Sequence, residues 1–327
     1  MDIDKSFEQK LIQASDNEFE KLALQVFKYQ YKNNAIYHQY ISSLGVNVNK
    51  INRIESIPFL PIQFFKNHTI KTGIWKEETI FESSGTTGQI TSKHHVKTVD
   101  FYKLNALQIF KSFFGDPSNY HIMALLPSYL ERGNSSLVQM VKFLIEASRS
   151  GISGFYLNEY DKLIQDIKTA KHSGRPILLI GVTFALLDLA DRYQINLKNH
   201  IVMETGGMKG RRKELTRMEV HEQLKKAFKV STVYSEYGMT ELLSQAYSSG
   251  NGLYKPAGTM KIILRDMYDP FSISNSIRQG GVNIIDLVNL YSCSFIETQD
   301  IGRMNGEFFE IVGRYDNSEL RGCNLMF

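Results

Sequence analysis

Short apolar segments alternate with amphipathic ones through the middle of the chain. Five apolar segments of four to six residues lie at 121–126, 154–157, 176–181, 201–204 and 230–234. The stretches before and between them carry apolar residues at helical spacing, which predicts helices over 99–114, 135–149, 159–172, 183–192 and 211–228. This alternation favours an α/β fold with a helix-covered, largely parallel sheet, whose ligands bind at the C-terminal ends of the strands.

The flanking regions follow other patterns. Residues 4–44 carry apolar side chains at roughly helical spacing and predict two or three helices, whereas Pro58 and Pro61 exclude a regular helix over 57–65. Beyond about residue 253 the chain becomes strand-rich, at 260–264, 282–288 and 307–312. We therefore predict three parts: a helical lead-in over 1–50, an α/β core over 51–252 and a smaller β-rich subdomain with a short tail over 253–327.

Composition and charge narrow the class of protein. The chain of 327 residues is 43% hydrophobic and 22% charged, as in soluble globular proteins. Its net charge of +4 is spread over 38 basic and 34 acidic residues, so we expect no nucleic-acid partner, although a small anionic substrate is compatible with it. The N-terminus lacks the apolar core of a signal peptide, and the longest apolar stretch, 177–190, is too short to span a bilayer.

The cysteine content points to a reducing compartment. Cys293 and Cys323 form neither a CxxC pair nor a disulfide framework, so we expect a cytoplasmic protein. Cys293 lies in a strand-like segment and is expected in the core.

A run of small hydroxyl residues and glycines follows the strand-like segment 78–81. Glycines allow the backbone to approach an anion, while backbone N–H groups and hydroxyls bind phosphate oxygens. The chain contains neither a P-loop nor a GxGxxG fingerprint, and an isolated run of this kind is more often a surface turn. The candidate phosphate-binding residues are Ser84, Gly85, Thr86, Thr87, Gly88 and Lys93.

Three further polar stretches lie at or near predicted strands. Gly206 and Gly207 allow a flat ring to lie against the backbone. An aspartate such as Asp300 accepts hydrogen bonds from ribose hydroxyls, and an arginine such as Arg314 adds charge near phosphate. The remaining stretch combines an aromatic ring, a glycine, a hydroxyl and a carboxylate, which suit base stacking, phosphate contact and Mg²⁺ binding. Its residues are Tyr237, Gly238, Thr240 and Glu241.

In this order, the four motifs resemble those of the adenylate-forming superfamily. The sequence is most similar to the acyl-protein synthetase (LuxE-type) family, through segments 57–61, 83–89, 205–209 and 320–323. The resemblance runs from about Ile57 to the end and implies the multilayer fold of adenylate-forming enzymes. Because the chain stops shortly after Arg314, we expect no full-size C-terminal lid and assign no lid lysine.

The resemblance implies that a carboxylic acid, expected to be a fatty acid, attacks the α-phosphate of ATP to give an acyl-adenylate. ATP and Mg²⁺ are the implied cofactors. The run 84–88, with Lys93, would hold the β and γ phosphates, and Tyr237 would stack on adenine beside Gly206, Gly207 and Gly238. The remaining roles would be α-phosphate contact for Thr240, Mg²⁺ binding for Glu241 and ribose binding for Asp300 with Arg314 nearby.

The resemblance also implies a second step in which a thiol accepts the acyl group. Cys323 lies near the C-terminus, where the family carries an acylated cysteine. His94 and His95 follow the phosphate-binding run, and adjacent strand residues face opposite ways, so at most one is expected to serve the site. Residues 126–136 are a candidate for the mouth of the acyl pocket.

Several alternatives stay open at this point. The final acceptor is CoA, as in a phenylacetate-type acyl-CoA ligase, or a partner protein. That partner would be a reductase, or an acyl carrier protein in a lipid or pigment pathway. A non-catalytic nucleotide-binding subunit would bind ATP without exchanging pyrophosphate.

Overall fold

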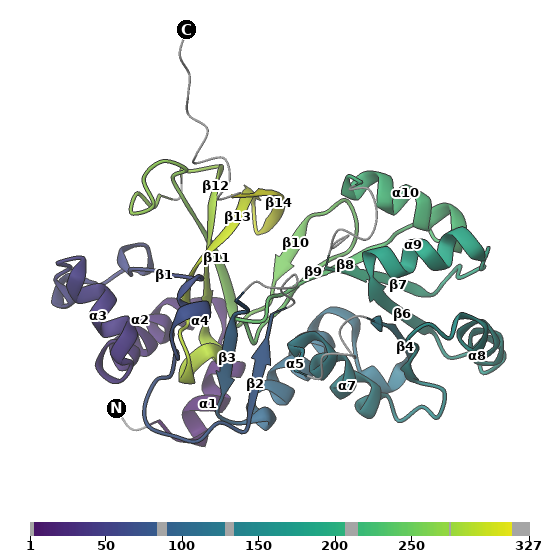
Figure 1. Ribbon diagram of the computed structural model, residues 1–327, viewed down its shortest axis with the longest axis horizontal. Helices are drawn as coiled ribbons and strands as arrows, with labels where there is room; N and C mark the ends of the chain where they lie inside the picture. The colour runs from purple at the N-terminus through teal and green to yellow at the C-terminus, as the bar shows by residue number, and fades with distance from the viewer. Residues whose placement is uncertain (1–2, 84–89, 128–133, 207–214, 275, 316–327) are drawn as a thin grey trace, which may run out of the picture.

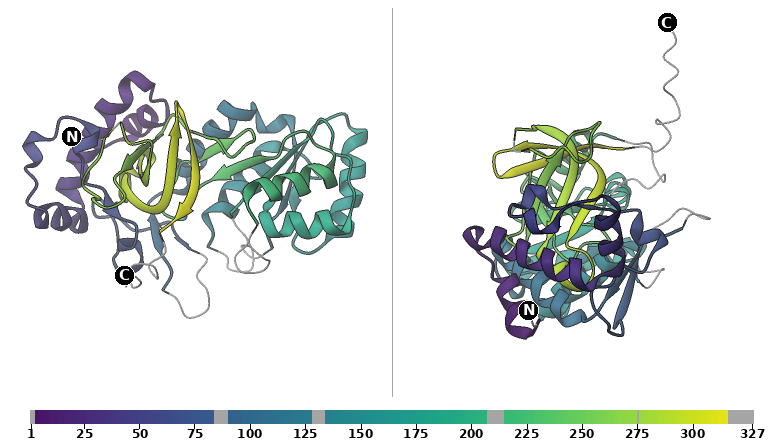
Figure 2. Two further views of the ribbon diagram at one scale, coloured as in Figure 1. Left: turned by 90° about the horizontal axis from the view of Figure 1, so that it is seen from above. Right: turned by 90° about the vertical axis from the view of Figure 1, so that its left-hand side faces the viewer.

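The computed structural model describes residues 3–83, 90–127, 134–206, 215–274 and 276–315. Within these ranges a 12-stranded mixed sheet runs along the elongated molecule (Figures 1 and 2). Eleven of its strands follow the order β11-β12-β13-β14-β10-β9-β8-β7-β6-β4-β5, and β1 pairs with β13. The predicted α/β fold class is confirmed.

Five strands form the parallel half of the sheet. They are β5 (Gly154–Phe155), β4 (His121–Leu125), β6 (Ile177–Val182), β7 (Ile201–Thr205) and β8 (Tyr234–Tyr237). Every residue of β4 and β6 is buried, as expected for strands covered on both faces. The helices of this half are α5 (Val99–Phe114), α7 (Ser136–Ser148), α8 (Tyr160–His172), α9 (Thr183–Arg192) and α10 (Arg217–Phe228), with α9 and α10 side by side (Figure 1).

Two predicted boundaries in this half differ from the structure. The strand predicted at 230–234 is wrong, because β8 begins at Tyr234 and ends at Tyr237. Val230 and Val233 lie in the connection after α10. They are apolar because they are buried, and not because they pair in a strand. The helix predicted from 211 starts at Arg217, where Thr216 and Glu219 form a capping box. Residues 211–214 lie outside the described ranges.

The antiparallel half continues from β8 through the short strands β9 (Ala246–Ser248) and β10 (Tyr254–Pro256). The strands β11 (Met260–Arg265) and β14 (Phe308–Arg314) match predicted strands, as does β12 (Gln279–Asp286), which is followed by the 3-10 helix η4 (Leu287–Tyr291). The strand β13 (Phe295–Asn305) was not predicted. Cys293 is buried, as expected, but precedes β13 and lies in no strand.

The N-terminal segment packs against this antiparallel half. The predicted helices are confirmed as α1 (Lys5–Ile12), α2 (Asp16–Asn33) and α3 (Ala35–Ser43). Gln30 of α2 is buried and donates hydrogen bonds to the backbone oxygens of Asn289 and Leu290. Beyond them, β1 (Leu60–Pro61) pairs in parallel with β13, and the short helix α4 (Phe64–Asn67) follows.

A separate hairpin flanks the hydroxyl-rich run. It consists of β2 (Thr79–Glu82) and β3 (Lys93–Val96), paired antiparallel with Glu82 opposite Lys93.

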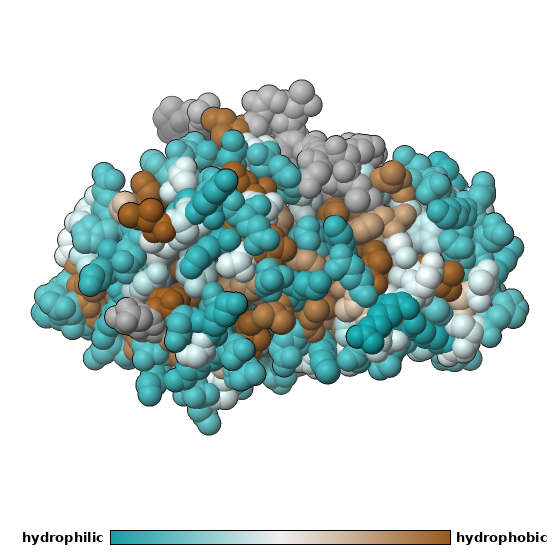
Figure 3. Space-filling model, turned by 90° about the horizontal axis from the view of Figure 1, so that it is seen from below, coloured by the Kyte–Doolittle hydropathy of each residue, from teal (hydrophilic) through white to brown (hydrophobic). Residues whose placement is uncertain are grey.

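The face of the molecule seen from below is largely hydrophilic, with apolar side chains in small groups (Figure 3). None of the helices in the described ranges combines the length and hydropathy that crossing a membrane requires.

Candidate functional site

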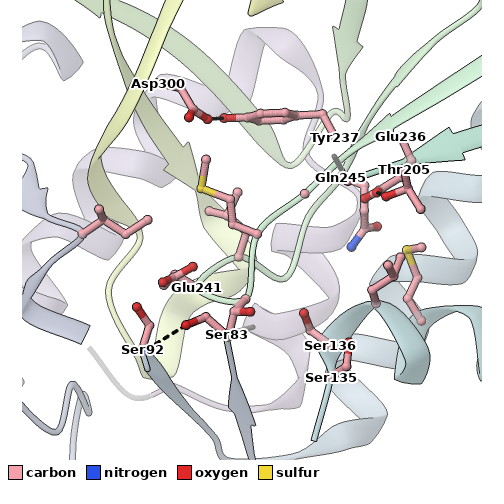
Figure 4. A pocket seen from close by; sticks show the side chains of 18 of the residues that line it. Ser83, Ser92, Ser135, Ser136, Thr205, Glu236, Tyr237, Glu241, Gln245 and Asp300 are labelled. Atoms are coloured by element: carbon pink, nitrogen blue, oxygen red, sulfur yellow. Dashed lines mark hydrogen bonds between the residues drawn. The ribbon is translucent and has the colours of Figure 1, made fainter. Parts of the chain in front are cut away.

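A cavity of about 540 Å³ opens at the C-terminal ends of β7 and β8, where the sheet changes from parallel to antiparallel. This is the edge at which the sequence predicted ligand binding. Side chains from the N-terminus of α7, from β13 and β14 and from the segment before β3 also reach it (Figure 4). The lining includes Lys66, Ser92, Tyr102, Ser136, Met140, Thr205, Gly206, Glu236, Tyr237, Gly238, Thr240, Glu241, Gln245, Asp300 and Arg314.

One side of the cavity brings Tyr237 and Asp300 together. The Tyr237 hydroxyl donates a hydrogen bond to Asp300 Oδ2 at 2.9 Å, across 63 positions of sequence. Arg314 lies opposite Asp300 in the β13–β14 ladder, with its Nε 3.8 Å from Asp300 Oδ1. Burial raises the pKa of Asp300, whereas the hydrogen bond from Tyr237 and the nearby arginines act in the opposite direction. An aromatic ring, a carboxylate and a cation thus line one wall.

Gly206 and Gly238 lie near this wall, and both positions need glycine. Gly206 has φ of 72°, a conformation that side chains strain to adopt. A Cβ atom on Gly238 would lie 2.6 Å from Glu236 Oε1, far inside van der Waals contact. Both glycines line the cavity together with Tyr237 and add no side chain to it.

Another side of the cavity carries the turn after β8, with Thr240 and Glu241. Glu241 is 6% exposed, and this burial raises its pKa, while a hydrogen bond from Ser92 and the charges of Arg314 and Lys66 act to lower it. Asn289 donates a hydrogen bond to the Glu241 backbone oxygen at 2.6 Å, and this bond holds the turn in place. The carboxylate is therefore fixed in place.

His94 connects this turn to β3. Its Nδ1 lies 2.8 Å from the Thr240 backbone oxygen, and burial lowers the pKa of His94 to about 4. His95 faces the other way, with its Nδ1 3.7 Å from Glu77 Oε1. The two histidines thus occupy opposite faces of the strand, as expected, and His94 is the one that contacts the site.

A third side of the cavity is formed by Thr205, Glu236 and Gln245, which we call the Glu236 cluster. Thr205 Oγ1 donates a hydrogen bond to Glu236 Oε2, and Gln245 lies beside them (Figure 4). Burial raises the pKa of Glu236 to about 7; the Thr205 hydrogen bond opposes this shift and the Glu204 charge adds to it.

Comparison with known protein families identifies the family to which this chain belongs. The family described as acyl-protein synthetase, LuxE, matches residues 4–327. The chain belongs to the LuxE family. No curated protein sequence matches this LuxE-family chain.

Solved structures with the fold of adenylate-forming enzymes resemble this LuxE-family chain. ATP-bound MatB from Rhodopseudomonas palustris is 16% identical with a TM-score of 0.54, over 72% of this chain and 47% of MatB. A 2-hydroxyisobutyryl-CoA ligase, in complex with 2-HIB-AMP and CoA, is 12% identical with a TM-score of 0.66, over 94% of this chain and 71% of the ligase. McyG A-PCP, complexed with phenylalanyl-adenylate, is 14% identical with a TM-score of 0.51, over 86% and 54%. This chain spans about half the length of MatB.

The candidate residues of this LuxE-family chain fall into three groups. The cavity is lined by Gly206, Tyr237, Gly238, Thr240, Glu241, Asp300 and Arg314. Lys93 lies on β3, is exposed and is not among the described lining residues. The following candidates lie outside the described ranges: Ser84, Gly85, Thr86, Thr87, Gly88, Gly207 and Cys323.

Several lining residues of the LuxE-family chain were assigned no role from its sequence, among them Thr205, Glu236, Ser92, Lys66 and Gln245. Thr205 and Glu236 lie inside stretches that the sequence singled out, directly before Gly206 and Tyr237. Ser92 precedes Lys93, and no local pattern marks Lys66 or Gln245. Their positions at the cavity arise from pairing between distant segments, which spacing along the chain does not report.

A divalent cation is implied by the adenylate-forming fold, and the residues present fit one. Within the described ranges no three His, Cys, Asp or Glu side chains group into a metal site. Mg²⁺, however, is commonly bound through one or two carboxylates together with substrate phosphates. Glu241 provides one buried carboxylate on the wall that also carries Thr240, which suits this mode of binding.

Proposed function

We propose that this protein activates a carboxylic acid with ATP, forming an acyl-adenylate and pyrophosphate, and then passes the acyl group to a thiol. The observation that carries the proposal is the convergence of Tyr237, Asp300, Thr240 and Glu241 on one cavity in a LuxE-family chain. The bound ATP of MatB and the adenylates of the CoA ligase and of McyG support the same chemistry on this fold.

The nucleoside end of ATP lies against the first wall. The Tyr237 ring stacks on adenine, and Gly206 and Gly238 leave room for it. Asp300 accepts hydrogen bonds from the ribose hydroxyls on its oxygens, one of which already accepts from Tyr237. Arg314 adds positive charge beside the sugar.

The phosphates lie toward Thr240, Glu241 and the run 84–88. Thr240 donates to the α-phosphate, and Glu241 holds Mg²⁺, which when bound neutralises charge on the phosphate oxygens. Among the described lining residues the cationic side chains are Lys66 and Arg314. Arg314 is paired with Asp300, whereas Lys66 has no carboxylate within ion-pair distance in the described ranges. We therefore assign Lys66 to the phosphates.

The chemical step is a displacement at phosphorus. A carboxylate oxygen of the acid attacks the α-phosphorus, and the bond from that phosphorus to the bridging oxygen breaks to release pyrophosphate. Negative charge builds up on the phosphate oxygens as this happens. Thr240 and Lys66 supply a hydroxyl and an ammonium donor to these oxygens, which lowers the barrier by stabilising the charge that develops on them.

The second step transfers the acyl group to a thiolate, with AMP as the leaving group. Cys323 is the candidate within the chain, as in the family that the sequence resembles. The bound CoA of the 2-hydroxyisobutyryl-CoA ligase favours the alternative in which a free or carrier-bound thiol is the acceptor.

Acid-dependent exchange of labelled pyrophosphate into ATP tests the first step, across a panel of carboxylic acids. Exchange that requires one class of acid is the expected result, and its absence with every acid would overturn the proposal. Intact-mass measurement of the wild type and of Cys323→Ser, each incubated with ATP and the active acid, tests the second step. An acyl adduct that persists in Cys323→Ser would remove Cys323 as the acceptor.

A further inference from the structure

The Glu236 cluster retains polar groups that the protein itself does not fully use. Glu236 is 7% exposed, while Thr205 and Gln245 are each 3% exposed. One Glu236 oxygen accepts from Thr205, and Gln245 Oε1 has no hydrogen-bond partner in the described part of the chain. Buried polar atoms are nearly always hydrogen-bonded in folded proteins. Unused capacity next to a cavity therefore indicates a ligand with complementary polar groups.

The position of the cluster relates it to the acid rather than to the nucleotide. In Figure 4, Tyr237 and Asp300 lie on one side of the cavity, Glu241 with Ser92 on another, and the Glu236 cluster on a third, above Ser135 and Ser136. Glu236 Oε1 lies close to Gly238, at the start of the turn that leads to Thr240. An acid whose carboxylate meets the α-phosphate at Thr240 extends its other end toward this cluster.

The size of the cavity limits how far that end extends. Clefts for ligands of drug size, a nucleotide among them, typically measure about 300–1,000 Å³. The cavity of about 540 Å³ lies within this range, and the nucleoside takes up part of it beside the acid. Leu137 and Met140 of α7, the helix that also carries Ser136, add apolar lining that suits a short carbon stem.

We propose that the acid is short and carries a hydrogen-bond donor, a hydroxyl or an ammonium group, on the end away from its carboxylate, and that Glu236 accepts from that donor. This inference rests on the proposed function and names its substrate class. A long alkyl tail would leave Gln245 Oε1 buried without a partner and would offer no donor to the Glu236 oxygen that Thr205 does not contact. Sites that hydrogen-bond a substrate group can reject the analogue lacking it by factors of roughly 10⁴. The fatty acid expected from the family resemblance is thus the less favoured substrate.

Matched pairs of acids test the inference. Alkanoates of three to twelve carbons are compared with their terminal hydroxy and amino counterparts, by pyrophosphate exchange and by the shift in unfolding temperature that each acid causes without ATP. Variants Glu236→Leu and Glu236→Gln are compared with Glu222→Leu and Glu222→Gln, since Glu222 is exposed on α10. Glu236→Leu removes the acceptor. Glu236→Gln keeps the size of the side chain and one acceptor oxygen, and it provides the test if the leucine variant does not fold.

We expect the wild type to prefer a short hydroxy or amino acid over its alkanoate by about tenfold or more in kcat/KM. Glu236→Leu should lose most of that preference. Glu236→Gln should lose it for the amino acids and keep part of it for the hydroxy acids, whereas both Glu222 variants should match the wild type. Preference for alkanoates of eight or more carbons, unchanged by either Glu236 substitution, would overturn the inference and leave acid activation intact. Polar acids that stabilise the wild type but support no exchange would retain the inference and overturn acid activation.

Discussion

Nδ1 of His94 lies 2.8 Å from the backbone oxygen of Thr240. A carbonyl oxygen only accepts, so Nδ1 carries the proton, and Nε2 is a buried nitrogen without a hydrogen-bond partner in the described ranges. The Phe65 ring packs edge-on against the imidazole, with 5.9 Å between ring centroids. The strand that leaves the hydroxyl-rich run is thereby tied to the turn that carries Thr240 and Glu241.

His94→Phe should lower pyrophosphate exchange by about tenfold or more, because small displacements of a reacting group have large effects on rate. His94→Asn should recover part of the loss, since its amide nitrogen can replace Nδ1 as the donor. The measurement is kcat for exchange, alongside the unfolding temperature. A purely structural role predicts that rate loss follows stability loss in both variants, so a His94→Phe enzyme that is stable and fully active would contradict the positioning role.

Glu236→Gln should change how stability depends on pH. Burial raises the pKa of Glu236 to about 7 in the folded state, above its model-peptide value near 4.5. The folded state therefore binds the extra proton between these values, and the free energy of unfolding falls as pH rises through this window. The wild type should lose up to about 3 kcal/mol relative to the variant between pH 4.5 and 8. Urea unfolding of both proteins at pH 5 and pH 8 measures the difference; equal gaps at the two pH values would refute it.

Tyr237→Phe should raise the KM for ATP by about three- to tenfold, with little change in kcat. The ring remains available for stacking, but Asp300 loses a hydrogen bond that orients it. Tyr237→Ala should have a larger effect, because the stacking surface is removed as well. Steady-state exchange kinetics at varied ATP provide the test, and equal effects of the two substitutions would show that stacking contributes nothing.

Lys66→Met should lower exchange by about ten- to a hundredfold and weaken MgATP binding. The side chain is exposed, so the unfolding temperature should stay within a degree or two of wild type. Lys66→Arg should retain part of the activity by preserving the charge. Lys50→Met, in the 3-10 helix η1 (Val48–Lys50), is the matched control. Calorimetric titration with MgATP supplies a readout that does not depend on turnover, and unaltered binding and exchange in Lys66→Met would exclude the role.

Glu241→Gln should lower exchange by about a hundredfold or more at low Mg²⁺, and excess Mg²⁺ should restore part of it, because Glu241 is assigned to hold the cation. Burial of the carboxylate raises its pKa and opposes its charged form, so the neutral amide should not destabilise the fold. Exchange measured across a Mg²⁺ titration distinguishes the outcomes. A loss of exchange that does not respond to Mg²⁺ at any concentration would contradict the role of Glu241 in binding the cation.

Local pattern predicted the elements that are mainly apolar: α5 and α9 from apolar residues at helical spacing, and β6 from a continuous apolar run. It failed at β13, where the alternately buried positions include the polar residues Thr298 and Asp300, so burial alternates along the strand without an alternation of apolar residues. The same limit applies to the site. Tyr237 and Asp300 were identified by residue type, but their hydrogen bond, and the approach of Lys66, depend on which strands pair.

The pairing of β1 with β13 joins Leu60 to Ile296, so nearly the whole polypeptide has to be synthesised before both partners exist. Until then Gln30 also lacks the backbone oxygens of Asn289 and Leu290, its acceptors in the finished protein. Contacts so distant in sequence form slowly, since a long loop has to close first. The helices made first therefore keep apolar faces uncovered until η4 and β13 have been made, and their final docking is a late event in folding.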